Sequence, residues 1–263
     1  MPAAAVWVTG SITGSPQIQS DAVRTSSTCA SATDATFPSG GSKYLNIITP
    51  QTMPSAKAIP TTGTFYTLNN ISSNTDVPGK ELPRASDTAD TDGVYKYIVN
   101  SFDSSLKIAP GKRVWLWVTG NIDLRDKVIV NQCGASGSLT NCGPFDFRIY
   151  PQSASVTPSP TLTLDRSTAT CDVFFHLPGY TVNFENSGTA TTQDCGSGAT
   201  NTSIYWVQNW NGGVSGTTIL NSPRTTWSTA VTTTSDYAVT GLTVPPLNPS
   251  IGPSSVWQIQ SDS

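Results

Sequence analysis

Acidic side chains beside strand-like segments are the residues of this sequence best suited to catalysis. The candidates are Asp123 and Asp126, which flank Arg125, and Asp165, which precedes Arg166 and is followed by Asp172. Hydrolysis of a glycosidic bond needs two carboxyl groups about 5–10 Å apart. The sequence gives no evidence that any two of these carboxylates lie close together. Charged residues beside strand ends more often mark solvated corners. We therefore assign no catalytic residue and keep a carbohydrate-active enzyme as an alternative.

A second acidic group consists of Asp87, Asp90 and Asp92, which precede Gly93 in the pattern D-x-x-D-x-D-G. Oxygen-rich loops that contain glycine suit Ca²⁺, but this run lacks both the D-x-D-x-D-G spacing and the terminal glutamate of a calcium loop. The alternative is a turn in which the aspartates accept hydrogen bonds from nearby backbone N–H groups. These three residues are the candidate metal ligands, and Ca²⁺ is the only cofactor that the sequence suggests.

Four tryptophans are candidate carbohydrate contacts. Trp115 and Trp117 alternate along one segment, so their rings point to the same side of a strand. Trp206 and Trp210 lie four residues apart, and the same rule places them on one face. Aromatic rings on an exposed sheet face can stack against sugars. The alternative is that one face of each strand belongs to the core and the other lies under a loop.

The only histidine and the paired threonines offer weaker signals. His176 has no second histidine and no Gly-x-Ser-x-Gly elbow to complete a hydrolytic triad. We expect it to be a structural imidazole rather than a general base or a metal ligand. Thr-x-Thr occurs at Thr161/Thr163 and Thr232/Thr234 without a period. A flat ice-binding face needs this pair on every stacked rung, so ice binding is not favoured.

The five cysteines indicate an oxidising compartment. None lies in a C-x-x-C pair, and with one histidine in the chain a Cys₂His₂ zinc site cannot be assembled. Their spacing predicts two local disulfides, Cys133–Cys142 and Cys171–Cys195, each closing a glycine-containing loop, with Cys29 left over. Because disulfides persist in extracellular proteins, we expect an extracellular or cell-surface location.

Composition argues against several classes of partner. Only 12% of the 263 residues are charged, against roughly 25% in an average globular protein. The 14 basic residues form no cluster, which argues against nucleic acid. No apolar run is long enough to cross a bilayer, and the first residues lack the basic and apolar parts of a signal peptide. We expect a mature form or a fragment that makes no membrane contact itself.

Short runs of β-branched and aromatic residues, separated by Gly, Pro, Asn, Asp and Ser, predict an all-β protein. The clearest runs are 6–8, 44–49, 64–68, 94–99, 114–122, 127–130, 145–150, 161–164, 173–177, 180–184, 204–210, 217–220 and 256–259. Several middle runs are apolar at both parities, as in parallel strands covered on both faces. Asp92-Gly93 and Asn211-Gly212 are the only Asp-Gly or Asn-Gly dipeptides, which mark tight hairpins. These features favour a right-handed parallel β-helix, or solenoid, with a β-sandwich as the alternative.

No composition shift divides the chain, so we expect one domain over residues 1–263. Residues 1–90 are its leading part, rich in long surface loops but with a leading rung over residues 8–23. Residues 90–221 form the core, and residues 222–263 contain a Pro-rich return and a closing strand. Helical structure is expected only as a short turn within residues 84–103.

The order of motifs over roughly residues 90–221 resembles a known family. The motifs are Tyr95-x-Tyr97, Pro110-Gly111-Lys112, Gly120-Asn121-Ile122, Arg148-Ile149-Tyr150, His176-Leu177-Pro178 and Trp206-Val207-x-x-Trp210. This pattern is similar to a bacterial surface domain of PilX-like pilus-assembly proteins, and most similar to the cyanobacterial hormogonium polysaccharide biosynthesis (HpsA-like) family. The resemblance implies an extracellular β-helical domain attached to secretion or pilus machinery, and it carries over no catalytic residue. The hydrophobic prepilin-like segment of that family has no counterpart in this sequence.

The sequence and the resemblance together suggest a structural role. We expect a scaffold domain of a surface or pilus-linked protein that supports exopolysaccharide secretion, gliding motility or adhesion. Its expected partners are a polysaccharide or other surface and pilus proteins. The alternatives are a β-helix polysaccharide lyase or hydrolase, and a carbohydrate-binding module.

Overall fold

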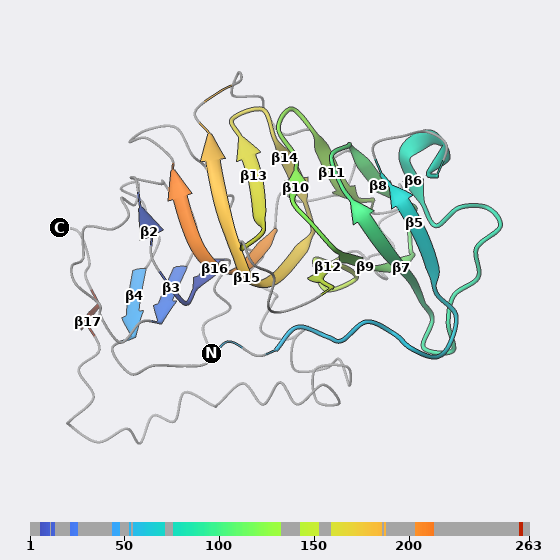
Figure 1. Cartoon of the computed structure of the whole chain (residues 1–263), viewed down its shortest axis with the longest axis horizontal. Helices are drawn as coiled ribbons and strands as arrows, with labels where there is room; N and C mark the ends of the chain where they lie inside the picture. The colour runs from blue at the N-terminus through green and yellow to red at the C-terminus, as the bar shows by residue number, and fades with distance from the viewer. Residues whose placement is uncertain are drawn as a thin grey trace.

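The protein is built from short β-strands (Figure 1). The computed structural model describes residues 6–10, 12–13, 22–25, 44–47, 53, 55–71, 76–132, 143–152, 159–185, 187, 203–212 and 258–259. The strands are β1 Val6–Val8, β2 Ile12–Thr13, β3 Ala22–Thr25, β4 Tyr44–Ile47, β5 Tyr66–Asn70, β6 Glu81–Leu82, β7 Val94–Ser101, β8 Leu106–Ile108, β9 Arg113–Val118, β10 Ile122–Asp123, β11 Val128–Asn131, β12 Phe147–Pro151, β13 Thr161–Asp165, β14 Ala169–Cys171, β15 Phe174–Glu185, β16 Ile204–Gly212 and β17 Gln258–Ile259. The all-β prediction is confirmed for this part of the chain.

The strands form two sheets in which neighbours run parallel. The large sheet has the order β17-β4-β3-β1-β16-β15-β12-β9-β7-β5, with β2, β10 and β13 attached beside this path, and the small sheet has the order β14-β11-β8-β6. Among the described pairs, β17 with β4 is the one antiparallel pair. The antiparallel layers that a β-sandwich requires are therefore not what these strands form.

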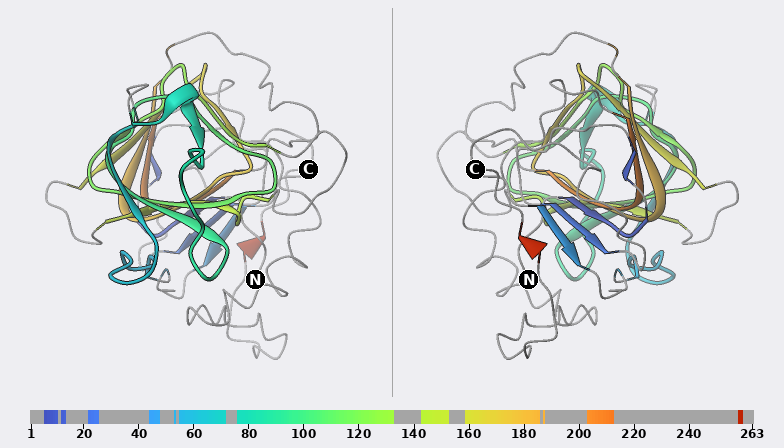
Figure 2. Two further views of the ribbon diagram at one scale, coloured as in Figure 1. Left: turned by 90° about the vertical axis from the view of Figure 1, so that its right-hand side faces the viewer. Right: turned by 90° about the vertical axis from the view of Figure 1, so that its left-hand side faces the viewer.

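The chain passes repeatedly from one sheet to the other. It leads from β7 to β8, from β9 through β10 to β11, and from β12 through β13 to β14, and in each series the first strand lies in the large sheet and the last in the small one. The end-on views of Figure 2 show these passes overlying one another around a common interior. Equivalent positions of successive passes therefore stack, side chain upon side chain.

The interior is filled by such stacks of apolar side chains. One of them follows the strand register through Tyr97, Leu116, Ile149, Phe175 and Tyr205, all within 1% of complete burial. The rings of Phe175 and Tyr205 stack with centroids 4.9 Å apart and planes 4° from parallel. Burial of large aromatic and aliphatic groups is the main stabilising contribution here.

The N-terminal strands join the large sheet beside β16. A leading rung was expected at the opposite end of the core, before β7. Strand β1 lies between β16 and β3, in parallel register with both. Residues 55–65 follow the lower edge of the molecule in Figure 1 and lead into β5 at the far end. Strands from the first ninety residues thus belong to the same sheet as the core.

The helical turn was predicted at the wrong place. Within residues 84–103 the main element is β7, whose alternation of buried and half-buried residues suits a strand. The described 3-10 turn is Pro78–Lys80, where Gly79 has φ of +67°. In the part of the chain that the structure describes, no helix is long and apolar enough to span a membrane.

Candidate functional site

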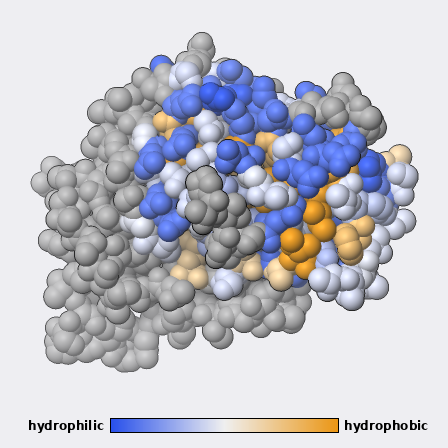
Figure 3. Space-filling view, in the orientation of Figure 1, coloured by the Kyte–Doolittle hydropathy of each residue, from blue (hydrophilic) through white to orange (hydrophobic). Residues whose placement is uncertain are grey.

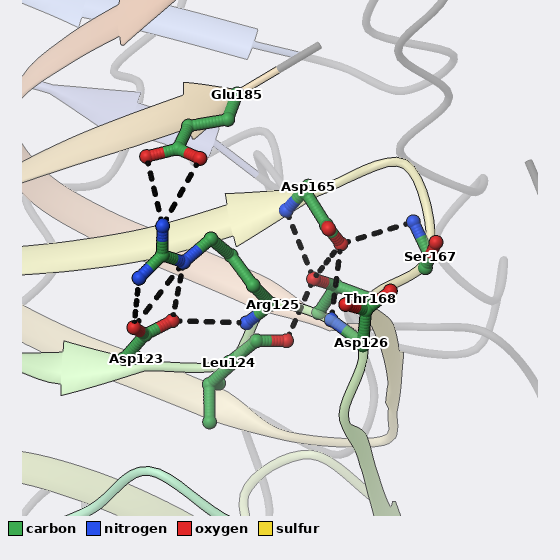
Figure 4. Close-up of polar contacts among 8 residues, drawn as sticks. All are labelled: Asp123, Leu124, Arg125, Asp126, Asp165, Ser167, Thr168 and Glu185. Carbon is green, nitrogen blue, oxygen red and sulfur yellow. Dashed lines mark hydrogen bonds and ion pairs between the residues drawn. The ribbon is translucent and has the colours of Figure 1, made fainter. Parts of the chain in front are cut away.

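The densest group of polar side chains lies where β10, β13 and β15 end (Figure 4). Arg125, which follows β10, contacts the Asp123 carboxylate through Nε and Nη2, with Nε 2.9 Å from Oδ1. Its Nη1 lies 3.3 Å from Oε2 of Glu185, at the end of β15. Since β13 pairs with both β10 and β15, the guanidinium joins two passes across a third strand.

The electrostatics of this group suit an ion pair rather than an acid–base pair. The hydrogen bond from Arg125 lowers the pKa of Asp123, and its bond to Asp123 raises the pKa of Arg125. Both side chains therefore stay charged over the ordinary pH range. A general acid needs a carboxyl group that is protonated near the working pH, so Asp123 is unsuited to that role.

The neighbouring Asp165 is a structural acceptor. It is 3% exposed, and its Oδ1 accepts hydrogen bonds from the backbone N–H groups of Asp126, at 3.2 Å, and Ser167, at 3.0 Å. Thr168 Oγ1 accepts from Asp165 N and donates to Leu124 O, both within 2.9 Å. These bonds hold together the corners of two successive passes.

A polar face extends from this group across the strands. We define it by eight outward residues: Asn121, Asp123, Thr161, Thr163, Thr181, Asn183, Asn209 and Asn211. They alternate with buried apolar residues, as the pattern of β13 shows most clearly. In the register, Asp123 lies beside Thr163, Thr163 beside Asn183 and Asn183 beside Asn211.

Hydrogen bonds between neighbouring strands order the polar face. Asn211 Nδ2 donates to Asn183 Oδ1 at 3.4 Å, and Asn209 Nδ2 donates to Thr181 Oγ1 at 3.3 Å. Thr161 N donates to Asn121 Oδ1 at 3.0 Å. Figure 3 shows hydrophilic residues gathered over the middle of this side, where Figure 1 places β10, β13 and β15.

The first pair of candidate tryptophans is buried. Trp115 and Trp117 do share the outward parity of β9, but they are 0% and 1% exposed. The returning segment covers them, because Trp117 Nε1 donates to Lys57 O at 2.8 Å and Lys57 Nζ lies 3.9 Å from the Trp115 ring centroid. The structure thus agrees with the alternative in which a loop covers this face of the strand. The two buried rings offer no surface on which a sugar could stack.

The second pair does not share a face, contrary to expectation. Trp206 lies on the outer side against Phe174, whereas Trp210 is in the interior, with its ring 5.7 Å from that of Tyr205. The register of β15 with β16 shifts between Leu177 and Thr181, opposite Gln208, and the burial pattern of β16 changes at the same point. The rule that alternate residues of a strand share one face therefore does not hold across this corner.

The three candidate calcium ligands separate into two ion-pair sites. Asp90 and Asp92 both contact Nζ of Lys96, the latter at 2.8 Å. The hydrogen bond from Lys96 lowers the pKa of Asp90 to about 2. Burial alone would lower the pKa of Lys96, but the bonds to the two carboxylates outweigh it and the pKa is raised. An ammonium group thus occupies the position between these two carboxylates.

Asp87 belongs to a different ion pair, with Arg84. Its Oδ2 lies 2.9 Å from Nε of Arg84 and accepts the hydroxyl of Tyr97 at 2.6 Å. Burial opposes ionisation of Asp87, but the hydrogen bonds from Arg84 and Tyr97 prevail and lower its pKa. Among the described residues, no group of three His, Cys, Asp or Glu side chains is arranged to hold a metal ion.

His176 and Cys171 have structural surroundings. The His176 ring is 2% exposed and stacks on Phe174, with centroids 5.4 Å apart and planes 9° from parallel. Cys171 is disulfide-bonded. Its partner lies outside the described residues, as do Cys29, Cys133, Cys142 and Cys195, so the predicted pairings remain predictions.

Sequence reasoning missed Glu185 and the polar face. The available signal was the recurrence of polar residues at alternate positions, Thr161-x-Thr163, Thr181-x-Asn183 and Asn209-x-Asn211. The motifs differ in residue type and are separated by loops of unequal length, which hid their common register. No protein-family model, no curated protein and no solved structure matches the chain.

Proposed function

We propose that this chain is a non-catalytic scaffold domain, built as a right-handed parallel β-helix, on the outside of the cell. The observation that carries the proposal is the inward stack from Tyr97 to Tyr205, which continues through five neighbouring strands. A core made of stacked passes is extended and rigid along its axis, and each pass contributes one row to the outer surface. Such a domain is suited to presenting a surface to a polymer or to other surface and pilus proteins.

The chemistry of the outer residues supports a scaffold over an enzyme. The exposed carboxylates of Asp123 and Glu185 share one guanidinium, and Asp165 is buried and accepts hydrogen bonds at a corner. The disulfide at Cys171 supports an extracellular location, because disulfides form and persist in oxidising compartments. The attachment to pilus or exopolysaccharide machinery rests on the sequence resemblance.

Incubation of the purified chain with neutral and acidic polysaccharides tests the proposal. We expect no new reducing ends and no unsaturated uronate products. Turnover that is lost in both Asp123→Asn and Glu185→Gln, with folding retained by circular dichroism, would replace the scaffold with an enzyme. Glu81→Gln, at an exposed position of β6 in the small sheet, is the matched control.

A further inference from the structure

The polar face combines hydrogen-bonding groups with near neutrality. Of its eight residues only Asp123 is charged, and Arg125 pairs with it. Its margins add two carboxylates, Glu185 and Asp103, which the bridge between Phe102 and Ile122 brings beside Asp123, so the margins are mildly negative. A surface of this kind disfavours a polyanion, and among the described residues no group of three acidic side chains is arranged to hold a metal ion.

The central residues of the polar face point hydroxyl and amide groups outward. Asn183 accepts a hydrogen bond at Oδ1 from Asn211, which leaves its NH₂ group as a donor, and Thr163 beside it carries a hydroxyl that both donates and accepts. Both side chains are half-buried and lie between neighbours of the same kind. Their positions are fixed by the register, so a ligand need not order them on binding.

We propose that the polar face binds a neutral polysaccharide, which lies across β10, β13, β15 and β16. Neighbouring strands are about 4.8 Å apart, so amide and hydroxyl groups recur at that spacing in the direction across the strands. A neutral sugar polymer likewise presents hydroxyl groups in a regular series, each able to donate and accept. The inference rests on the proposed function, since it names the class of polymer that the scaffold would hold.

Hydrogen bonds exchanged with water are individually weak, so the expected affinity comes from their number. The eight residues of the polar face include no aromatic side chain, so stacking does not contribute. The proposal therefore predicts weak binding to long chains and little binding to single sugars. Uronate polymers should bind less than neutral ones.

The test is affinity electrophoresis of the full chain in gels that contain dextran, amylose, mannan or galactan, with alginate as the acidic polymer. At least one neutral polymer should retard the chain, and Thr181→Ala/Asn183→Ala should weaken that retardation by about tenfold, the loss of one to two hydrogen bonds. The matched control is Thr67→Ala/Asn69→Ala, the same Thr-x-Asn pair exposed on β5. It should retain full retardation.

Several outcomes would overturn the proposal. They are no retardation by any neutral polymer, stronger retardation by alginate, and an equal loss in both double variants. Adsorption of the chain to growing ice, without retardation by glycans, would assign the polar face to ice instead. None of these outcomes produces cleaved polymer, so failure here is distinct from failure of the scaffold proposal, which turnover alone would show.

Discussion

At the scale of single residues, the ion pairs of Lys96 make the free energy of unfolding depend on pH in the acidic range. Asp90 has a folded pKa of about 2 against an ordinary value of 3.8, chiefly because Lys96 donates to it. A carboxyl group that binds protons more weakly when folded stabilises the protein above pH 3.8, and this contribution is lost as the pH falls to about 2. We expect Asp90→Asn to lower the free energy of unfolding at pH 7 and to flatten its fall in this interval.

Urea unfolding at a series of pH values measures this effect. Asp103→Asn, at an exposed position between β7 and β8, should leave the free energy of unfolding at pH 7 unchanged. A parallel acid profile for the Asp90→Asn variant and the unaltered chain would show that Asp90 does not carry the effect.

Gly212 is required for a different reason, a close approach of two strands. Its φ is +94°, and a Cβ at this position would collide with the carbonyl group of Phe184 on the paired strand. Gly93 also has positive φ, +75°, but a Cβ there would meet open space. We expect Gly93→Ala to cost about 1–2 kcal/mol from backbone strain, and Gly212→Ala to cost about 1–3 kcal/mol more. Equal losses in thermal or urea unfolding would contradict the collision.

At the scale of elements, stacking between passes is measurable as a coupling energy. Phe175 on β15 and Tyr205 on β16 stack directly, so Phe175→Leu and Tyr205→Leu should be non-additive by about 0.5–1.5 kcal/mol in a double-mutant cycle. Tyr97 lies three strands from Phe175 in the same stack. The pair Phe175→Leu and Tyr97→Phe should therefore be additive. No coupling between Phe175 and Tyr205 would argue against the stacked passes.

The strands were predictable from sequence because their signal is local. Val114, Leu116 and Val118 alternate with Trp115 and Trp117, and the structure places the two sets on opposite faces of β9, as expected. Which outer face lies open was not predictable. Trp115 is buried by Lys57 and its neighbours, a contact between residues 58 positions apart that no periodicity encodes.

The candidate site was harder to predict than the fold, for a related reason. Asp123, Arg125 and Glu185 meet because β10 and β15 both pair with β13, and the register of those pairs depends on the lengths of the intervening loops. Asp90 and Asp92, proposed from the sequence as metal ligands, do share a cation, but it is the ammonium group of Lys96, six residues after Asp90. A lysine at the start of the strand that follows the turn, in β7, was a signal in the sequence against a calcium loop.

At the scale of the whole molecule, a stack of parallel strands has two ends that invite further strands. One end of the large sheet pairs β4 with the antiparallel β17. At the other end, Asp76 Oδ2 accepts hydrogen bonds from the backbone N–H groups of Asn69 and Asn70 on β5, both at 3.1 Å. A carboxylate bound to an edge strand occupies donors that another chain would otherwise use, and burying its charge under an incoming strand would cost free energy.

We therefore expect Asp76→Ala to increase self-association of the chain through β5. Loss of bonds to a charged acceptor should also lower the free energy of unfolding by about 1–3 kcal/mol. Sedimentation velocity over a range of concentrations measures association, and Asp103→Ala controls for the loss of a surface charge. A variant that remains monomeric while losing stability would limit the role of Asp76 to the turn before the 3-10 segment. Association of the Asp76→Ala variant alone would show that a single carboxylate limits the growth of the stack at this end.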